Sequence, residues 1–380
     1  MKISVVLPCR NEEGSIAICI EKIKKAFESI KEKDYEIIVS DSSRDKSAEI
    51  AKKIAQNSNK KVKVIKHDLD GYGNACLKGI EHAKGKYVII GDVDNTYDFS
   101  EIPRFIEELD KGYDLVIGSR FKGKIERGAM PFSHRYIGTP ILNFLLSLFF
   151  RKKISDCNSG FRAIKKEALD KLSLKTTGME FASEMLIKAI KNNLKIKEIP
   201  ITYSKRTGNS KLKSFSDGWK HLRFMLLYSP NYVFLIPGIF LTILGFILML
   251  LILTKSLTLF GITFQTHPMF IGSVLVILGY QLILTGFFSR IYAHNHLGEK
   301  DYNLEKMYSF FNLEKAITAG AIFLLAGLYI FLNILIKWLS TNFGELATIN
   351  LSIFALTFII LGIQTIFAGF FFSILGIKEK

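Results

Sequence analysis

Cysteine is scarce in this sequence of 380 residues, and the patterns that bind zinc are missing. The four cysteines, Cys9, Cys19, Cys76 and Cys157, include no C-x-x-C pair, so we expect reduced thiols in a cytosolic compartment. The seven histidines show no metal-ligand spacing. No helix-turn-helix, zinc-finger or RNP signature is present, and nucleic acid is therefore not an expected partner.

Acidic side chains are too few to balance the basic ones, and the excess positive charge lies in one part of the chain. The sequence has 51 Lys and Arg against 35 Asp and Glu. Residues 231–380 contain only 8 basic and 6 acidic residues, so residues 1–230 carry +14 of the net charge of +16. Such a charge favours anionic partners, of which phospholipid head groups and nucleotide diphosphates suit this chain best.

The later part of the chain has instead long apolar runs that are free of charge. A membrane-spanning helix needs about 20 apolar residues. The predicted spans are residues 232–254, 268–289, 316–336 and 350–376. The loop between the second and third spans is charged and contains four basic residues (Arg290, Lys300, Lys306 and Lys315), whereas Lys255 and Lys337 are the only basic residues of the other two loops. By the positive-inside rule, we expect a multi-pass membrane protein with its first domain and both termini in the cytoplasm.

The first part of the chain alternates short β-rich runs with amphipathic helical patterns. This alternation predicts an α/β domain with a doubly wound, mainly parallel sheet over residues 1–225, followed by an all-α membrane domain over residues 226–380. The first predicted strands are residues 3–8, 35–40, 62–66, 87–90 and 115–118, with helices at 13–30, 45–57, 73–83 and 99–111. A strand at 161–164, a helix at 180–191 and a strand at 196–203 complete the domain.

Two further segments are expected to touch the membrane surface. The apolar stretch 137–150 is too short to span a bilayer and is followed by three basic residues, so it predicts a helix lying in the interface. Residues 203–223 contain six Lys and Arg against one Asp, directly before the first span. Such a segment is typical both of lipid-phosphate binding and of a solvated cytosolic flank.

Polar side chains gather where the predicted strands end. Ligands of doubly wound sheets bind beyond the carboxyl ends of the strands. Asp92 and Asp94 stand two residues apart, so their side chains point the same way from an extended chain. Two carboxylates at this edge suit Mg²⁺ or Mn²⁺, the usual partners of a diphosphate. Residues 8–12 and Asp41 follow neighbouring strands, and we expect one cleft to collect all of them.

A series of motifs runs in order along the first domain. They are Ile3-Ser-Val-Val-Leu-Pro-Cys-Arg-Asn-Glu12, Ile37-Ile-Val-Ser-Asp41, Gly91-Asp-Val-Asp94, Ile117-Gly-Ser-Arg120, Asp156-Cys-Asn-Ser-Gly-Phe-Arg162 and Glu180-Phe-Ala-Ser-Glu184. The first four resemble the family 2 glycosyltransferases of GT-A fold. The last two resemble, within that family, the polyprenyl-phosphate sugar synthases typified by dolichol-phosphate mannose synthase. The resemblance covers about residues 1–225.

This resemblance implies a GDP- or UDP-sugar as donor and a polyprenyl phosphate as acceptor. The positions that match nucleotide-sugar-binding residues are Pro8, Arg10, Glu12, Asp41 and Asp92. Asp92 and Asp94 match the pair that binds Mg²⁺ or Mn²⁺. Mannose synthases often have Gln where this chain has Thr96, which leaves mannose and glucose both open as the transferred hexose.

The chemistry of a lipid phosphate decides which further residues are candidates. Its second pKa is near 6, so the attacking oxygen is already ionised and the enzyme has mainly to position it and to compensate charge. Arginines hold phosphate bidentately, and the candidates are Arg120, Arg135 and Arg206. The predicted catalytic residues are Asp94, Asp156 and Arg120. Direct displacement inverts the anomeric centre.

Two alternative functions fit parts of the pattern. A processive polysaccharide synthase also joins this fold to membrane helices, but the Q-x-x-R-W segment of those enzymes is missing around Trp219 and Trp338. A lipid-linked-sugar flippase or scaffold would contain a degenerate catalytic domain, whereas Asp41, Asp92 and Asp94 are all present. We therefore predict a metal-dependent, membrane-bound hexosyltransferase acting on a polyprenyl phosphate.

Overall fold

The chain forms two compact units, Met1–Leu227 and Tyr228–Lys380. The computed structural model describes residues 2–208, 214–254, 257–259, 262–264, 266–296, 313–344 and 348–375. The division between the units falls two residues beyond the predicted boundary between residues 225 and 226.

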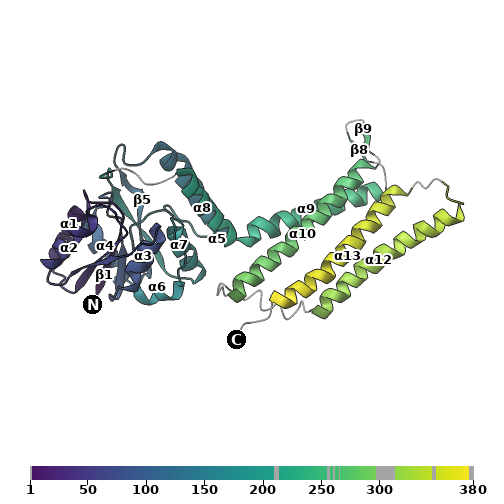
Figure 1. The fold of residues 1–380 in the computed structure, drawn as a ribbon. Helices are drawn as coiled ribbons and strands as arrows, with labels where there is room; N and C mark the ends of the chain where they lie inside the picture. Colours follow the sequence, from purple (N-terminus) through teal and green to yellow (C-terminus); the bar gives the residue numbers. More distant parts are fainter. Residues whose placement is uncertain are drawn as a thin grey trace. The chain divides into compact units, whose positions relative to one another are not determined.

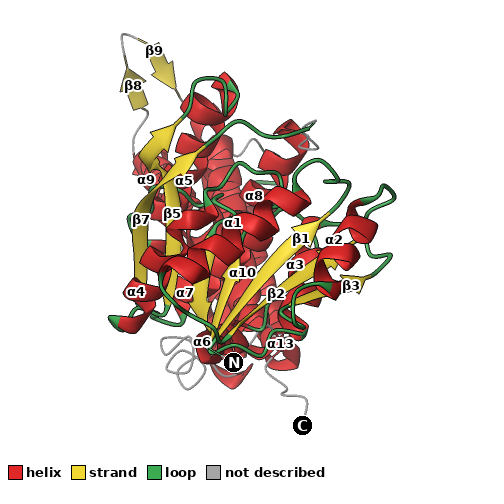
Figure 2. Ribbon diagram, turned by 90° about the vertical axis from the view of Figure 1, so that its left-hand side faces the viewer, coloured by secondary structure: helices red, strands yellow, loops and turns green. Residues whose placement is uncertain are grey.

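A seven-stranded sheet lies at the centre of the first unit (Figure 2). The strands are β1 (Ile3–Cys9), β2 (Tyr35–Asp41), β3 (Val62–Lys66), β4 (Tyr87–Ile90), β5 (Leu115–Ile125), β6 (Arg162–Lys165) and β7 (Ile196–Tyr203). Their order is β3-β2-β1-β4-β6-β5-β7. Only β6 runs antiparallel to its neighbours among the paired strands of this sheet. The sheet confirms the predicted doubly wound, mainly parallel α/β class.

Helices cover both faces of this sheet (Figure 2). The helical segments of the first unit are α1 (Ile16–Ser29), α2 (Ser47–Gln56), α3 (Tyr72–Glu81), η1 (Phe99–Glu101), α4 (Ile102–Asp110), η2 (His134–Gly138), α5 (Thr139–Phe150), α6 (Lys166–Leu172), α7 (Phe181–Lys191) and α8 (Ser214–Leu227). Buried apolar residues of α1 and α4 pack against Ile3, Val5 and Leu7 of β1. Since these residues alternate along the strand, they share one face of the sheet.

One strand is longer than the sequence pattern predicts. β5 continues beyond residue 118 to Ile125, and its pairing with β7 shifts register between Ser119 and Lys124. The segment after residue 118 is largely polar, and residues 122–124 are exposed, so it lacks the apolar run by which the strand was recognised. Pairing with the edge strand β7 extends β5 regardless of this composition.

A buried aromatic cluster supports the loops at the carboxyl end of β4. The Phe161 side chain is fully buried, and its ring centroid lies 4.3 Å from that of Phe105 and 5.5 Å from those of Tyr97 and Phe99. Aromatic pairs at these distances add stability beyond the burial of their area. The cluster therefore gives residues 92–99 a rigid base.

The second unit consists mainly of long apolar helices. Its elements are η3 (Asn231–Leu235), α9 (Ile236–Thr254), β8 (Leu257–Leu259), β9 (Ile262–Phe264), α10 (His267–His296), α12 (Leu313–Ser340) and α13 (Ile349–Leu375). Four segments are long and apolar enough to cross a membrane: Asn231–Leu253, His267–Tyr292, Leu313–Ser340 and Ile349–Leu375. They coincide with the four predicted spans to within four residues at each end.

These helices pack as close pairs, α9 with α10 and α12 with α13 (Figure 1). A Cβ atom added to Gly245 of α9 would lie 2.6 Å from the carbonyl oxygen of Gly272 in α10, so only glycine permits this approach. Hydroxyl pairs join α10 to α13: Ser273 with Thr357 at 2.8 Å and Tyr280 with Thr365 at 2.6 Å. Small residues and hydrogen bonds thus hold the apolar helices together.

Replacing Phe161 with alanine should lower the free energy of unfolding of the first unit by about 3–5 kcal/mol, because it leaves a cavity in the aromatic cluster. The change would be measured by urea unfolding monitored with far-UV circular dichroism. The control is Ile18→Ala, whose side chain in α1 is 45% exposed and should change stability by about 0.5 kcal/mol or less. Equal losses in both variants would contradict the supporting role of Phe161.

Candidate active site

The turn after β1 is held against the end of β2 by a chain of hydrogen bonds. Asn11 adopts a left-handed conformation, with φ of 51°, and its backbone N–H donates to Ser43 Oγ at 2.8 Å. The Ser43 hydroxyl in turn donates to Asp41 Oδ1 at 2.6 Å. Asp41 is fully buried, and its Oδ2 has no hydrogen-bond partner among the described residues. This oxygen is suited to accept a hydrogen bond from a bound ligand.

Further contacts fix the other residues of this turn. The backbone N–H of Glu12 donates to Ser47 Oγ at 2.8 Å. Arg10 is about half exposed and forms an ion pair with Asp70 at 2.9 Å. Pro8 lies in β1 opposite Ser40 of β2. The structure therefore brings Pro8, Arg10, Glu12 and Asp41 to one edge of the sheet, as the sequence predicts.

Both oxygens of the Asp94 carboxylate accept hydrogen bonds from neighbouring groups, which leaves room for a further ligand at Oδ2. Its Oδ1 accepts hydrogen bonds from the backbone N–H of Thr96 at 3.1 Å and from the Thr96 hydroxyl at 2.5 Å. Its Oδ2 accepts one from Arg206 Nη1 at 2.9 Å. Asn95, which lies between Asp94 and Thr96 in the chain, adopts a φ of 64° and accepts a hydrogen bond from Lys22. Thr96 thus orients Asp94, a role that its sequence position alone did not indicate.

The carboxylate of Asp92 has very different surroundings. Its Oδ1 is buried and has no hydrogen-bond partner in the described part of the chain. Its Oδ2 lies against Gly160, where an added Cβ atom would approach it to 2.5 Å. Burial and the neighbouring charge of Asp94 raise the pKa of Asp92 from 3.8 to about 7. The Tyr72 hydroxyl and the charges of Arg206 and Arg120 oppose this rise without cancelling it, so the charge of Asp92 is only partly compensated.

These two aspartates fit a divalent cation. Asp92 Oδ1 is the acceptor without a partner among the described residues. Asp94 follows two residues later, and both lie just beyond the end of β4. Among the described residues, no group of three or more His, Cys, Asp and Glu side chains could hold a metal ion. A pair of carboxylates is nevertheless a suitable protein contribution for Mg²⁺, which takes its other ligands from water and from substrate phosphates.

Arg206 connects the turn after β1 to the pair formed by Asp92 and Asp94. Its Nη1 donates to Asp94, and its Nη2 donates to Glu12. Its Nε is buried and has no hydrogen-bond partner among the residues that the structure describes. The sequence predicts acceptor binding for Arg206 because it precedes the membrane spans, whereas the structure places it on the acidic residues at the sheet edge. The positive charge of the Arg206 guanidinium offsets the negative charges of Asp94 and Glu12.

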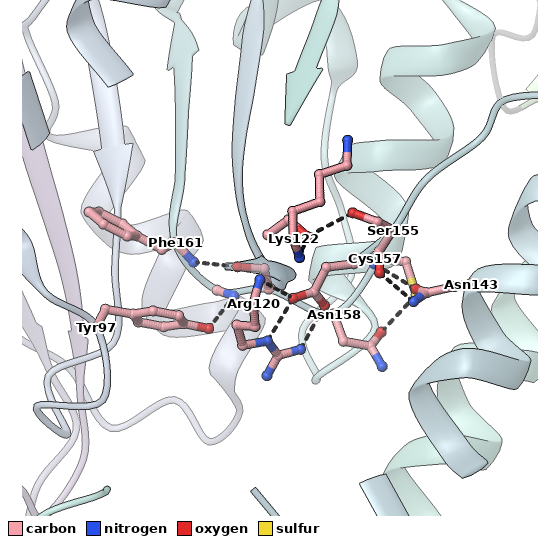
Figure 3. Close-up of polar contacts among 12 residues, drawn as sticks. Tyr97, Arg120, Lys122, Asn143, Ser155, Cys157, Asn158 and Phe161 are labelled. Atoms are coloured by element: carbon pink, nitrogen blue, oxygen red, sulfur yellow. Dashed lines mark hydrogen bonds and ion pairs between the residues drawn. The ribbon is translucent and has the colours of Figure 1, made fainter. Parts of the chain in front are cut away.

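Arg120 and Asp156 form a buried bidentate ion pair. Arg120 Nε and Nη2 each donate to one Asp156 oxygen at 2.7 Å, and the Arg120 backbone N–H donates at 3.0 Å. Although burial alone would lower it, this pairing raises the pKa of Arg120 above its usual range. Figure 3 shows Tyr97 and Phe161 on one side of Arg120 and Asn143 on the other. Two of the three predicted catalytic residues, Arg120 and Asp156, thus bind each other, which the sequence did not reveal.

Arg162 holds the loop that carries Asp156 and Gly160. It is buried and donates to the backbone carbonyls of Ser159 at 2.7 Å, Cys157 at 2.6 Å and Ala182 at 2.5 Å. The Gly160 N–H donates to the Tyr97 hydroxyl at 2.8 Å. Sequence reasoning gave Arg162 and Gly160 only as parts of a motif. Arg162 and Gly160 keep this loop in contact with Asp92.

Arg135 lies elsewhere, on η2 before the apolar helix α5. Its guanidinium carbon is 5.3 Å from the centre of the Tyr136 ring. Large apolar side chains on this segment are exposed: Phe132 at 72%, Phe144 at 65% and Tyr136 at 57%. An exposed apolar surface with basic residues is typical of helices in a membrane interface.

Comparison with known proteins agrees with these features. Residues 4–173 match the family model described as glycosyl transferase family 2, and residues 287–376 match the family 2 C-terminal transmembrane region. A low-salt glycan biosynthesis hexosyltransferase of Haloferax volcanii is 38% identical over 375 residues, which are 98% of this chain and 89% of that protein.

Two other proteins match the first unit. The dolichol-phosphate mannosyltransferase of Pyrococcus furiosus is 33% identical over 219 residues, covering 56% of this chain and 60% of that protein. A structure of glucosyl-3-phosphoglycerate synthase from Mycobacterium tuberculosis aligns with a TM-score of 0.46 at 22% identity, over 60% of this chain and 80% of that one. From the full-length match and both family models, the chain belongs to the family 2 glycosyltransferases and is a glycosyltransferase with a family 2 transmembrane region.

Proposed function

We propose that this glycosyltransferase moves a hexose, mannose or glucose, from a GDP- or UDP-sugar to a polyprenyl phosphate of the dolichyl type. The observation that carries the proposal is the Asp92–Asp94 pair at the sheet edge, with the shielded Oδ1 of Asp92 and the buried side chain of Asp94, next to Asp41 and the turn after β1. The relative named as a dolichol-phosphate mannosyltransferase supports this acceptor class, and the relative named as a hexosyltransferase supports transfer of a hexose.

The donor end of the reaction uses the residues of the sheet edge. Asp41 Oδ2 accepts a hydrogen bond from the nucleoside. Asp92 and Asp94 would hold Mg²⁺ or Mn²⁺, which supplies charge compensation for the departing nucleoside diphosphate. Arg206, with its Nε–H unpaired among the described residues, donates to the same diphosphate. The chain thus binds the leaving group from both sides.

The acceptor end requires positioning more than proton transfer. A lipid monophosphate is mostly dianionic at neutral pH, so its oxygen attacks without a dedicated base. Arg135 on η2 binds this phosphate, and the Nη1 of Arg120 is the atom left for it beyond the pair with Asp156. Asp156 keeps the Arg120 side chain in place. A single in-line displacement inverts the configuration at the anomeric carbon.

The membrane arrangement follows from the apolar segments. The exposed side chains of η2 and α5 rest in the membrane interface, and the four apolar helices anchor the chain. The catalytic unit and both termini lie on the cytoplasmic side, where nucleotide sugars occur.

A transfer assay tests this function directly. The full chain in detergent, with Mn²⁺ or Mg²⁺ and polyprenyl phosphate, is supplied with radiolabelled GDP-mannose, UDP-glucose and related nucleotide sugars. Label should pass into the organic phase with one donor and only when metal is present. Binding of a nucleotide sugar without any lipid product would show that the acceptor is another molecule.

Replacing Asp92 with asparagine should stabilise the metal-free protein while preventing metal binding. Because the pKa of Asp92 is raised, the folded state holds a proton that the unfolded chain releases between about pH 4 and 7, so stability falls as the pH rises through this window. The gain in the thermal midpoint of Asp92→Asn should therefore be largest at pH 8 and small at pH 5. Mn²⁺ should raise the midpoint of the wild type alone. A gain that does not depend on pH would contradict this account of Asp92.

Replacing Arg135 with alanine should affect the acceptor and not the donor. Loss of a hydrogen bond between charged groups should raise KM for polyprenyl phosphate about tenfold or more, while KM for the nucleotide sugar stays constant. Initial rates at varied concentrations of each substrate measure both. The control is Arg127→Ala, an exposed arginine in the preceding loop, which should change neither constant. An unaltered KM for the lipid would remove Arg135 from the acceptor site.

A further inference from the structure

The motif at residues 180–184 contains two glutamates in opposite surroundings. Glu184 is buried and accepts hydrogen bonds from the backbone N–H of Lys175 at 3.0 Å, the N–H of Thr176 at 2.8 Å and the Thr176 hydroxyl at 2.6 Å. It also pairs with Lys188 at 2.7 Å. These contacts satisfy the Glu184 carboxylate within the protein, so its role is to fix the preceding loop.

Glu180 differs in that one of its oxygens is left unsatisfied. Its Oε2 is shielded from solvent and has no hydrogen-bond partner in the described part of the chain. The carboxylate lies against Gly178, where an added Cβ atom would come within 2.5 Å of Oε2. Glycine at this position therefore makes the room that the carboxylate takes up. A shielded acceptor without a partner is suited to a donor on a bound ligand.

Two contacts place Glu180 at the substrate edge of the sheet. The backbone N–H of Asn74, in the first turn of α3, donates to the carbonyl oxygen of Thr177 at 3.1 Å. α3 begins at this edge because it follows the parallel strand β3. On the other side, Arg162 lies opposite Ile90, the last residue of β4, and donates to the carbonyl oxygen of Ala182. Residues 177–182 thus lie beside the end of the strand that leads to Asp92.

One side chain connects this loop to the aspartate pair. The Tyr72 ring packs edge-on against Phe181, the residue after Glu180, with 6.3 Å between the ring centroids. Tyr72 also interacts with the Asp92 carboxylate. Tyr72 therefore connects the residue after Glu180 to the Asp92 carboxylate.

The chemistry of a carboxylate limits what Glu180 recognises. Ionised, it only accepts hydrogen bonds, and it repels both the diphosphate and the lipid phosphate. The neutral donors that the reaction brings to this edge are the hydroxyl groups of the sugar.

We propose that Glu180 recognises a hydroxyl group of the transferred hexose and thereby selects the donor sugar. This inference rests on the proposed function and adds the residue that distinguishes sugars. A site that hydrogen-bonds a hydroxyl discriminates strongly against an analogue without it, because the buried acceptor is then left unpaired. The donor is accordingly a nucleotide hexose that keeps its hydroxyl at the position facing Glu180.

Binding measurements test the proposal without requiring turnover. The affinities of GDP and UDP are compared with those of GDP-mannose and UDP-glucose, in Mn²⁺, for the wild type, Glu180→Ala and Glu180→Gln. Glu180→Ala should leave the nucleoside diphosphate affinity unchanged and weaken the nucleotide sugar about 10- to 100-fold, and Glu180→Gln should restore part of the loss. Glu167→Gln, an exposed glutamate of α6, is the matched control and should change neither affinity.

Deoxy sugars separate recognition from a merely structural role. Among monodeoxy analogues of the accepted nucleotide sugar, one should bind the wild type about 10- to 100-fold more weakly than the parent sugar and show almost no further penalty with Glu180→Ala. The same penalties in both proteins would overturn the proposal. If wild-type protein binds the sugars with this pattern but makes no lipid-linked product, the proposed function fails while the role of Glu180 stands.

Discussion

The site depends on the carboxylate of Asp92, whose Oδ1 is shielded from solvent and whose charge the protein only partly offsets. Asp92 lies against Gly160, its Oδ1 is without a partner among the described residues, and its pKa is raised to about 7. Keeping a carboxylate in this state costs stability, which natural proteins accept at functional sites. The surrounding elements maintain it: Tyr97 holds Gly160 in place, and Phe161 fills the space beneath.

The neighbouring charges are arranged in pairs of different accessibility. Arg120 and Asp156 satisfy each other in a buried, bidentate pair, and the geometry of such a pair is costly to alter. Arg206 bridges Asp94 and Glu12 but keeps its Nε–H unpaired within the described residues. The pair of Arg120 and Asp156 is fixed in place. Arg206 instead connects the turn after β1, the pair of Asp92 and Asp94, and the segment that precedes the apolar helices. Under the proposed function, the nucleotide and the metal ion would therefore both bind next to Arg206.

Local patterns in the sequence account for what was predicted correctly. Apolar runs bounded by turns located the strands, and uncharged stretches located the four apolar helices. The spacing of Asp92 and Asp94 was interpreted as an extended chain, whereas β4 ends at Ile90 and Asp94 lies in a turn beyond it. Partners distant in sequence left no such signal. Arg120 pairs with Asp156 over 36 positions, and nothing in the spacing of Gly160 shows that it touches Asp92. The polar end of β5 was missed because edge pairing, not composition, extends that strand.

The central claim is that the aspartate pair and a nucleoside diphosphate share one metal ion. The most direct measurement is the affinity for Mn²⁺, by titration followed with electron paramagnetic resonance, in the absence and presence of saturating GDP or UDP. A shared ion predicts that the accepted nucleotide raises Mn²⁺ affinity about tenfold or more, and that Mn²⁺ raises nucleotide affinity by the same factor. Mn²⁺ and nucleotide that bind independently of each other would contradict the claim.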